Sequence, residues 1–212
     1  MVATPKKRSP PPQFEDGLIL SAACKRQVAK GVRHILEAVS EHVDGQGTRE
    51  TPYRVARMYD ELLAGYKVDP QALLNEALFD VEYDEMVIVK DIDFHSLCEH
   101  HMLPFYGRAH VGYLPDRKVI GLSKIPRMVE MFARRLQVQE RMTQQIASFL
   151  DETVKPLGVG VVVEGVHLCA VMRGVKKPGS VMVTSAVRGL FKDNHATREE
   201  FMAHVRQRFE AR

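Results

Sequence analysis

Apolar residues recur at helical spacing in the first part of the chain. Between residues 18 and 43, valine, leucine and isoleucine return every three or four positions, as at Val28, Val32 and Val39. This spacing predicts an amphipathic helix, which the glycines after residue 43 would end.

A second helix is expected from residue 51 to residue 65. Thr51 is a good N-cap residue, and Pro52 suits the first helical position because its missing N–H group has no partner there. Val55 and Leu62 lie on one apolar stripe, and Gly65 is a typical helix end.

Further along the chain, alternating or β-branched apolar runs predict strands at residues 86–94, 106–114, 159–172 and 181–187. Two helices are expected between the second and third strands, one from Ser123 to Leu136 and one over residues 138–154. Thr197 and Glu200 form a capping box for a last helix to about Arg208. The pattern predicts an α+β fold in which N-terminal helices precede an antiparallel sheet with a helix pair.

Residues 1–17 differ in composition from the rest. Prolines and basic residues crowd the first fourteen positions, so this tail is expected to be disordered. Residues 18–212 are expected to form a single domain, because no linker or repeat interrupts them.

Composition excludes several classes of function. The net charge of +3 is too small for a nucleic-acid-binding surface, and no apolar run is long enough to span a membrane. The three cysteines, two of them next to histidines, favour reduced thiols in the cytoplasm. Cys24 is expected to be a small buried residue of the first helix.

The metal chemistry of the chain centres on the stretch from His95 to His101. Cys98-x-x-His101 can present a thiolate and an imidazole to one ion, and Cys169 can supply a third ligand from the strand expected at 159–172. If that strand is regular, His167, Cys169 and Arg173 point the same way. A Cys/His/Cys set suits Zn²⁺, and three protein ligands are typical of a catalytic zinc.

Other readings of this cluster remain open. His95 or His100 could complete a four-ligand structural zinc site, and Cys98 could instead form a disulfide with Cys169. If the site is open, His100 and His167 flank the metal and are placed for proton transfer at neutral pH.

Two further groups of residues suggest a ligand that carries phosphate and a ring with hydrogen-bond donors. Ser123, Lys124 and Arg127 surround the start of a predicted helix, where backbone N–H groups favour phosphate. Glu140, next to Gln139 at the start of the following helix, could accept two hydrogen bonds from a guanine edge. The simpler interpretation of Glu140 is a favourable acid in a first helical turn.

These stretches resemble the motifs of the GTP cyclohydrolase I family, in the same order, from about residue 18 to the end of the chain. The matching segments are Glu50-Thr51-Pro52 with Arg54-Val55-Ala56, Cys98-Glu99-His100-His101, Gly121-Leu122-Ser123-Lys124, Leu136 to Arg141, His167-x-Cys169-x-x-x-Arg173-Gly174, and Gly189-Leu190-Phe191.

The resemblance implies that the chain hydrolyses GTP to formate and 7,8-dihydroneopterin triphosphate, the first step of pterin and folate biosynthesis. It implies that Cys98, His101 and Cys169 bind zinc, that zinc-bound water attacks C8 of guanine, and that His100 and His167 are the acid/base pair. It further implies substrate contacts from Glu140, Gln139, Ser123, Lys124, Arg127, Arg173 and Arg54, with Arg54 coming from a neighbouring subunit.

The resemblance also implies the tunnelling fold, in which sheets of several subunits join into a barrel. The expected assembly is a decamer, a dimer of pentamers, with active sites at subunit interfaces and a possibility of allosteric control. The alternative function is a non-catalytic oligomeric GTP-binding protein with structural zinc.

Overall fold

A computed structural model of the chain describes residues 13–39, 45–74 and 77–207. The chain divides into two compact units, Met1–Glu61 and Leu62–Arg212. Most of the tail expected to be disordered, residues 1–12, lies outside the described residues. The expectation of one domain over 18–212 remains a prediction.

Helices α1 (Ala22–Val39) and α2 (Thr51–Leu62) make up most of the first unit. The predicted helix start at Leu18 is wrong, because the backbone N–H groups of Leu18, Ile19 and Leu20 donate to the Asp60 carboxylate at 2.7–2.9 Å instead of entering a helix. The predicted end at Val43 lies outside the described residues.

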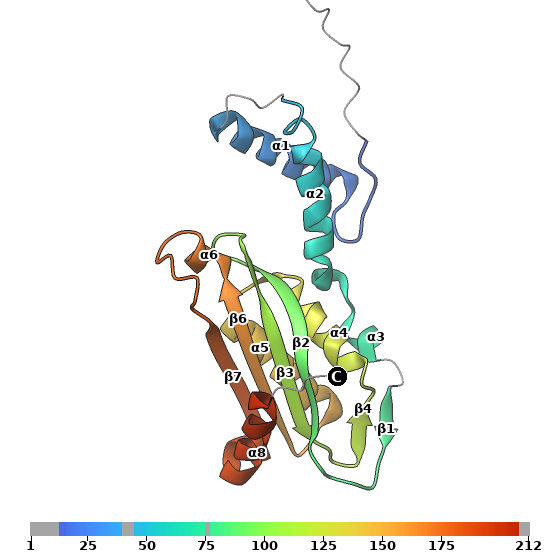
Figure 1. Cartoon of the computed structure of the whole chain (residues 1–212). Helices are drawn as coiled ribbons and strands as arrows, with labels where there is room; N and C mark the ends of the chain where they lie inside the picture. Colours follow the sequence, from blue (N-terminus) through green and yellow to red (C-terminus); the bar gives the residue numbers. More distant parts are fainter. Residues whose placement is uncertain (1–12, 40–44, 75–76, 208–212) are drawn as a thin grey trace, which may run out of the picture. The chain divides into compact units, whose positions relative to one another are not determined.

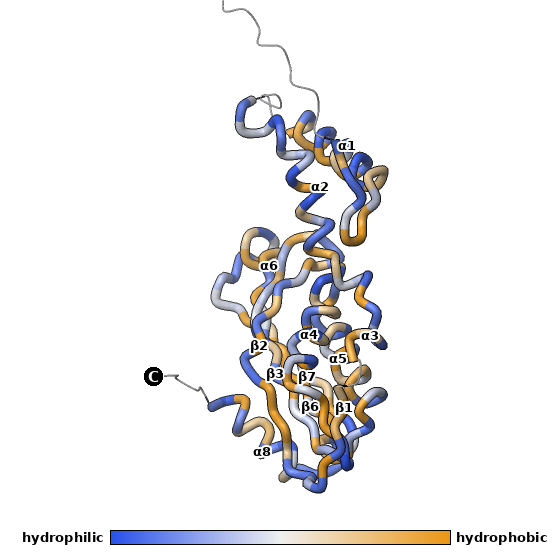
Figure 2. The backbone as a smooth tube through the Cα atoms, turned by 90° about the vertical axis from the view of Figure 1, so that its right-hand side faces the viewer, coloured by the Kyte–Doolittle hydropathy of each residue, from blue (hydrophilic) through white to orange (hydrophobic). Residues whose placement is uncertain are grey.

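The buried face of α1 is not the expected one. Cys24 is exposed, and its neighbour Lys25 is buried, where its Nζ lies 3.3 Å from Asp60. Apolar and polar positions alternate along α1 (Figure 2), yet Ile35 and Val39 are 62% and 74% exposed. The apolar side chains of Ile35 and Val39, near the end of α1, are therefore left largely uncovered by the described chain.

The second unit is a curled sheet with helices on both faces (Figure 1). Its elements in chain order are η1 (Ala64–Lys67), α3 (Pro70–Leu74), β1 (Leu78–Asp80), β2 (Val87–Cys98), β3 (Pro104–Leu114), β4 (Lys118–Ile120), α4 (Lys124–Ala133), β5 (Leu136–Gln137), α5 (Gln139–Val154), β6 (Gly158–His167), α6 (Leu168–Val171), β7 (Met182–Gly189), α7 (Leu190–Asp193) and α8 (His195–Arg206).

Five strands form the main sheet in the order β5-β2-β3-β6-β7. The pairs β2–β3, β3–β6 and β6–β7 are antiparallel, whereas the two-residue β5 pairs in parallel with the end of β2. Strands β1 and β4, which the sequence pattern did not predict, form a separate antiparallel pair. The expected α+β class with an antiparallel sheet and a helix pair is confirmed.

Alternation along the strands directs one face of the sheet toward α4 and α5. Phe105, Val111 and Val161 are fully buried there against helix residues such as Met128 and Ile146. Hydrophobic positions are concentrated along these strands in Figure 2. This core fixes the strand ends that carry the candidate site.

On the opposite face, α8 packs against the sheet through Phe201. A Cβ added to Gly112 or Gly160 would lie 2.8 Å or 2.6 Å from the nearest phenylalanine ring atom, so both glycines make room for aromatic rings. The predicted capping box of α8 is wrong, because Asn194 is the N-cap and its Oδ1 accepts from the N–H groups of Ala196 and Thr197. Arg208, the expected end of this helix, lies outside the described residues.

The strand expected over residues 159–172 is shorter than predicted. It ends at His167, and residues 168–171 form a helical turn closed by a bond of 2.9 Å from Met172 N to Leu168 O. The expectation that His167, Cys169 and Arg173 share a face of one strand is therefore wrong. None of the helices in the described part of the chain is both long and apolar enough to cross a bilayer.

Candidate metal centre and active site

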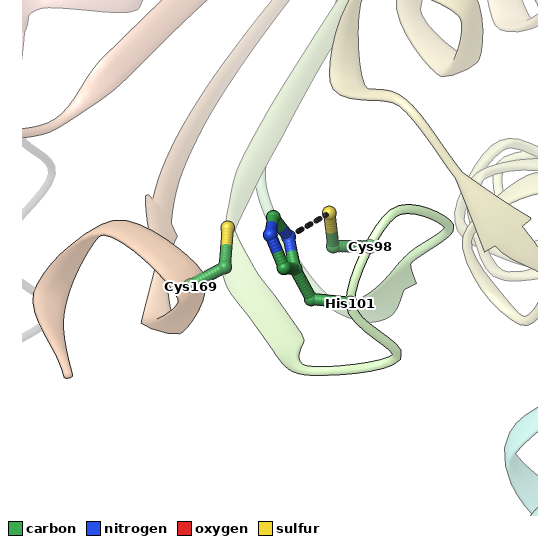
Figure 3. Close-up of side chains that lie close together, drawn as sticks. All are labelled: Cys98, His101 and Cys169. Carbon is green, nitrogen blue, oxygen red and sulfur yellow. Dashed lines mark hydrogen bonds between the residues drawn. The ribbon is translucent and has the colours of Figure 1, made fainter. Parts of the chain in front are cut away.

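Cys98, His101 and Cys169 come together at one end of the main sheet (Figure 3). Their ligand atoms all lie within 4.8 Å of one another, and Cys98 Sγ is 3.8 Å from His101 Nδ1. Cys98 is the last residue of β2, His101 lies in the following turn, and Cys169 lies in α6. The cluster thus joins segments about seventy residues apart in sequence.

A tight turn after β2 aligns the first two of these residues. Met102 N donates to Cys98 O at 2.7 Å, and Cys98 N donates to Leu103 O at 2.9 Å. Met102 has a φ of 54°, which lets the chain reverse directly into β3. The residues from His95 to Cys98 therefore belong to β2, which extends past the predicted strand end at residue 94, and only Glu99, His100 and His101 of the motif lie on the connection to β3.

The donor set fits a zinc ion. In a tetrahedral zinc site, thiolate and imidazole ligand atoms lie roughly 3.5–4 Å apart, close to the spacing of this cluster. Burial raises the pKa of the Cys169 thiol, the neighbouring Cys98 raises it further, and Arg173 opposes both. A divalent cation would stabilise both thiolates. Both cysteines are free thiols, so the disulfide reading finds no support in the described chain.

Charged groups surround the outer side of the cluster. Arg173 Nη1 lies 2.6 Å from His101 Nε2, and Arg141 pairs with Glu99. The hydrogen bond from Arg141 holds the pKa of Glu99 below its usual value. His100 projects from the same turn, with its Nδ1 3.9 Å from Cys98 Sγ and its side chain 65% exposed. His100 is therefore accessible to a ligand.

His167, at the end of β6, lies in a less polar setting. Its ring stacks on Phe105 with a centroid distance of 4.5 Å and an interplanar angle of 4°. Its Nε2 is 2.9 Å from Gln139 Oε1. Burial lowers the pKa of His167, and the nearby carboxylate of Glu140 opposes this shift. The ring is held in place, and burial favours its neutral form.

Gln139 and Glu140 open α5 beside this histidine. Gln139 is 0% exposed, whereas Glu140 is exposed. The bond from Glu99 N to Gln137 O, at 3.0 Å, ties the residues before α5 to the metal-binding turn. The sequence pattern did not reveal that the Gln139 amide contacts His167, because its partners come from distant strands.

The proposed phosphate-binding residues do not join this cluster within one chain. Ile120 N donates to Tyr113 Oη at 3.2 Å, so the chain enters α4 beside the far half of β3. Tyr113 and Phe105 are eight residues apart on that strand, which corresponds to roughly 25 Å. Within the described part of the chain, no hydrogen bond or ion pair links Ser123, Lys124 or Arg127 to the cluster.

The remaining predicted substrate residue, Arg54, belongs to the first unit. Its Nη2 donates to Gly47 O at 2.8 Å and to Thr51 Oγ1 at 3.0 Å. The predicted roles of all these substrate-binding residues remain predictions.

Comparisons with known proteins agree with the motifs. The family model described as GTP cyclohydrolase I matches residues 28–206. A GTP cyclohydrolase 1 from Wolinella succinogenes is 53% identical over 175 residues, which cover 82% of this chain and 94% of the relative. One from Chlorobium phaeovibrioides is 52% identical over 193 residues, 91% of this chain and 86% of the relative. One from Gloeobacter violaceus is 56% identical over 171 residues, 81% of this chain and 80% of the relative.

Among solved structures, the apo form of an archaeosine synthase QueF-Like is similar to part of the chain. The TM-score is 0.40 and the identity 20%, over 49% of this chain and 93% of that one.

Proposed function

The chain belongs to the GTP cyclohydrolase I family, and from this premise we propose that it converts GTP and water to formate and 7,8-dihydroneopterin triphosphate. The observation that carries the proposal is the meeting of Cys98, His101 and Cys169 at one end of the sheet, beside His167. A family match identifies the class of enzyme, and this cluster supplies the means to activate water.

We propose zinc as the metal, held by Cys98, His101 and Cys169. A bound zinc ion acts as a Lewis acid that acidifies water at neutral pH. Zinc binds thiolates and imidazoles, whereas magnesium and calcium prefer oxygen ligands.

Proton transfer is assigned to the two histidines that flank the cluster. His100 is accessible on the turn, and His167 is held against Phe105, where burial favours the neutral ring. Opening the imidazole ring of guanine requires protons to be delivered to ring nitrogens and removed from water. An accessible histidine and a fixed neutral one suit these two tasks.

Recognition of the guanine ring is assigned to Glu140. Its carboxylate is exposed at the start of α5 and close enough to His167 to affect its pKa. A carboxylate can accept two parallel hydrogen bonds from the ring N–H and amino group of guanine. The backbone of Gln139 is assigned to the same guanine-binding position, because its side chain is already hydrogen-bonded within the protein.

Binding of the triphosphate is assigned to Ser123, Lys124, Arg127, Arg173 and Arg54. Arg173 is already at the cluster, whereas the start of α4 is far from it along β3. We therefore propose that a second copy supplies the α4 residues, so that active sites lie between subunits. The exposed apolar residues of α1 and the open edge of β7 provide surfaces for such an assembly. A decamer with a closed barrel of sheets is the proposed form.

The test is to incubate the purified protein with GTP and to measure formate together with oxidised-pterin fluorescence, with and without a zinc chelator. Both products should appear together, and both should vanish when the metal is removed and return when zinc is restored. GTP binding without formate, in protein shown to contain zinc, would instead support a non-catalytic GTP-binding protein.

A further inference from the structure

The Gln139 side chain makes four hydrogen-bond contacts in a fully buried position. Its Nε2 lies 3.1 Å from Val163 O, 3.0 Å from Met182 O and 3.1 Å from Thr184 Oγ1. Its Oε1 lies 2.9 Å from His167 Nε2. Two of the three neighbours of Nε2 are carbonyl oxygens, which can only accept.

This environment determines the orientation of the amide. If the amide were flipped, its oxygen would face the carbonyl oxygens of Val163 and Met182, and two buried acceptors would lose a donor. The amino group therefore faces β6 and β7, and the Gln139 oxygen faces His167.

The adjacent hydroxyl groups are consistent with this orientation. Thr143 Oγ1 donates to Gln139 O at 2.8 Å, so the contact of 2.7 Å between Thr143 and Thr184 requires the Thr184 hydroxyl to donate. Thr184 Oγ1 is then free to accept from the Gln139 amino group. The two hydrogens of the Gln139 amino group are shared among three acceptors, Val163 O, Met182 O and Thr184 Oγ1.

From this network we infer that Gln139 is a positioning residue, which holds His167 in the tautomer that carries its hydrogen on Nε2. Because Oε1 can only accept, His167 Nε2 must be the donor across the contact of 2.9 Å. Nδ1 is then the ring nitrogen with the free lone pair, and the one atom of this ring able to accept a proton while the bond persists.

Two neighbouring residues support the same arrangement. The stack on Phe105 fixes the plane of the imidazole. The hydrogen bond to Gln139 then sets the rotation of the ring within that plane and its tautomer. A Cβ on Gly165 would lie 2.4 Å from Gln139 Oε1, so the absence of a side chain there lets the oxygen reach His167. The catalytic meaning of the inference rests on the proposed function, in which His167 transfers protons.

The direct test is magic-angle-spinning ¹⁵N NMR of the assembled, zinc-loaded protein with ¹⁵N-labelled histidine. The signals of His167 are identified by their loss in His167→Ala. In wild-type protein, Nε2 should show the chemical shift of a protonated nitrogen and Nδ1 that of an unprotonated one. The opposite pattern in wild-type protein would overturn the inference, whatever the behaviour of any variant.

The variant for the kinetic test is Gln139→Met, which keeps the length of the side chain and removes its hydrogen bonds. We expect a mixture of tautomers at His167 and a fall in kcat on the order of 10- to 100-fold, with KM changed less than about threefold. A rise in KM at unchanged kcat would overturn the inference, because it would mean that the side chain binds substrate.

The matched control is Gln137→Met, which removes another buried glutamine amide two residues earlier. Gln137 is 2% exposed and bonds to Phe132 O, Gln145 and Arg141, without contact to a histidine. Gln137→Met should leave the tautomer of His167 unchanged. An equal change of tautomer in Gln137→Met and Gln139→Met would overturn the inference. Absence of formate from wild-type protein would refute the proposed function, while the tautomer signals would still decide the role of Gln139.

Discussion

Two adjacent residues at the start of α5 have opposite surroundings. Gln139 is fully buried with every polar atom bonded, and Glu140 is exposed beside His167. A helix turns by about 100° per residue, so neighbours in sequence point in different directions. One of them can therefore orient a catalytic group while the next contacts the substrate.

Glu140→Gln should weaken binding of GTP. The variant keeps the shape of the side chain but replaces one acceptor oxygen by a donor, which would face the donors of the guanine edge. Hydrogen bonds to a charged group contribute about 1.5–3 kcal/mol, so KM should rise about 10- to 100-fold. Glu152→Gln, an exposed change later in α5, should leave KM unchanged, and an equal effect of both would contradict the role of Glu140.

Cys169→Ser should lose both the metal and turnover. A serine hydroxyl is a far weaker zinc ligand than a thiolate at neutral pH. Metal content measured on protein dialysed against excess zinc should fall to background together with formate release. Cys24→Ser removes the exposed thiol of α1 and should retain both. Full activity in metal-free Cys169→Ser protein would refute the zinc assignment.

Residue type and spacing were enough to predict that Cys98, His101 and Cys169 lie together, because Cys98-x-x-His101 and His167-x-Cys169 each have a thiol and an imidazole close in sequence. The surroundings of Gln139 were not predictable in this way. Its partners Val163, Met182 and Thr184 come from two strands whose pairing is set by tertiary packing. A buried amide has no signature in sequence.

At the level of whole elements, Asp60 links α2 to the chain before α1. Burial would raise the pKa of Asp60, but bonds from the N–H groups of Leu20, Ile19 and Leu18, together with Lys25, lower it to about 2. A shift of this size from the ordinary aspartate pKa of 3.8 corresponds to about 2 kcal/mol of stability. The folded pKa is the lower one, so this stability is present above about pH 4 and is lost as the pH falls toward 2.

Asp60→Asn should therefore loosen the segment before α1 at neutral pH. Hydrogen exchange at the amides of Leu18, Ile19 and Leu20 should become about 30-fold faster, the equivalent of about 2 kcal/mol. The difference from wild type should shrink when the measurement is repeated at pH 3. Asp84→Asn, an exposed change in the second unit, should have no effect there. Equal protection in Asp60→Asn at pH 7 would contradict this account.

Gly165→Ala tests whether β6 must leave space for the Gln139 amide. The new Cβ would lie 2.4 Å from Gln139 Oε1, so the side chain must shift, at a cost of about 1–3 kcal/mol in stability. Gly179→Ala meets nothing within 4 Å and serves as the control. Thermal unfolding and formate release should both fall for the first variant alone. Wild-type values for Gly165→Ala would show that the contact relaxes freely.

Long periodic elements were predicted with nearly correct bounds, as for α5 and β3, because their apolar faces pack against one core. The end of β6 was misplaced, since Leu168, Cys169 and Ala170 continue the apolar run without a breaking residue. Strands β1 and β4 were missed because three residues are too few to show a period. In both cases the deciding contacts are non-local.

At the scale of the molecule, the separation of the start of α4 from the metal centre predicts complementation between defective subunits. Lys124→Ala and Cys98→Ser should each be inactive alone. If refolded together, random assembly would produce some sites with an intact cluster from one copy and an intact α4 start from another. Roughly a quarter of wild-type formate release should return.

The control for complementation is a mixture of Cys98→Ser with Cys169→Ser. Both changes lie in the cluster of a single chain, so no mixed site can regain three ligands. Absence of recovery in the Lys124→Ala mixture, with assembly confirmed by light scattering, would show that one chain supplies the whole site.

The parallel pairing of β5 with the end of β2 joins two kinds of specificity in one rigid piece. Leu97 and Cys98 pair with Leu136 and Gln137, and α5 begins two residues later. Under the proposed function, the metal and the guanine ring are bound by separate side chains on these neighbouring segments. In the course of evolution, exchange of Glu140 alone would then change the base that is accepted, while Gln139 and the metal-binding residues stayed the same.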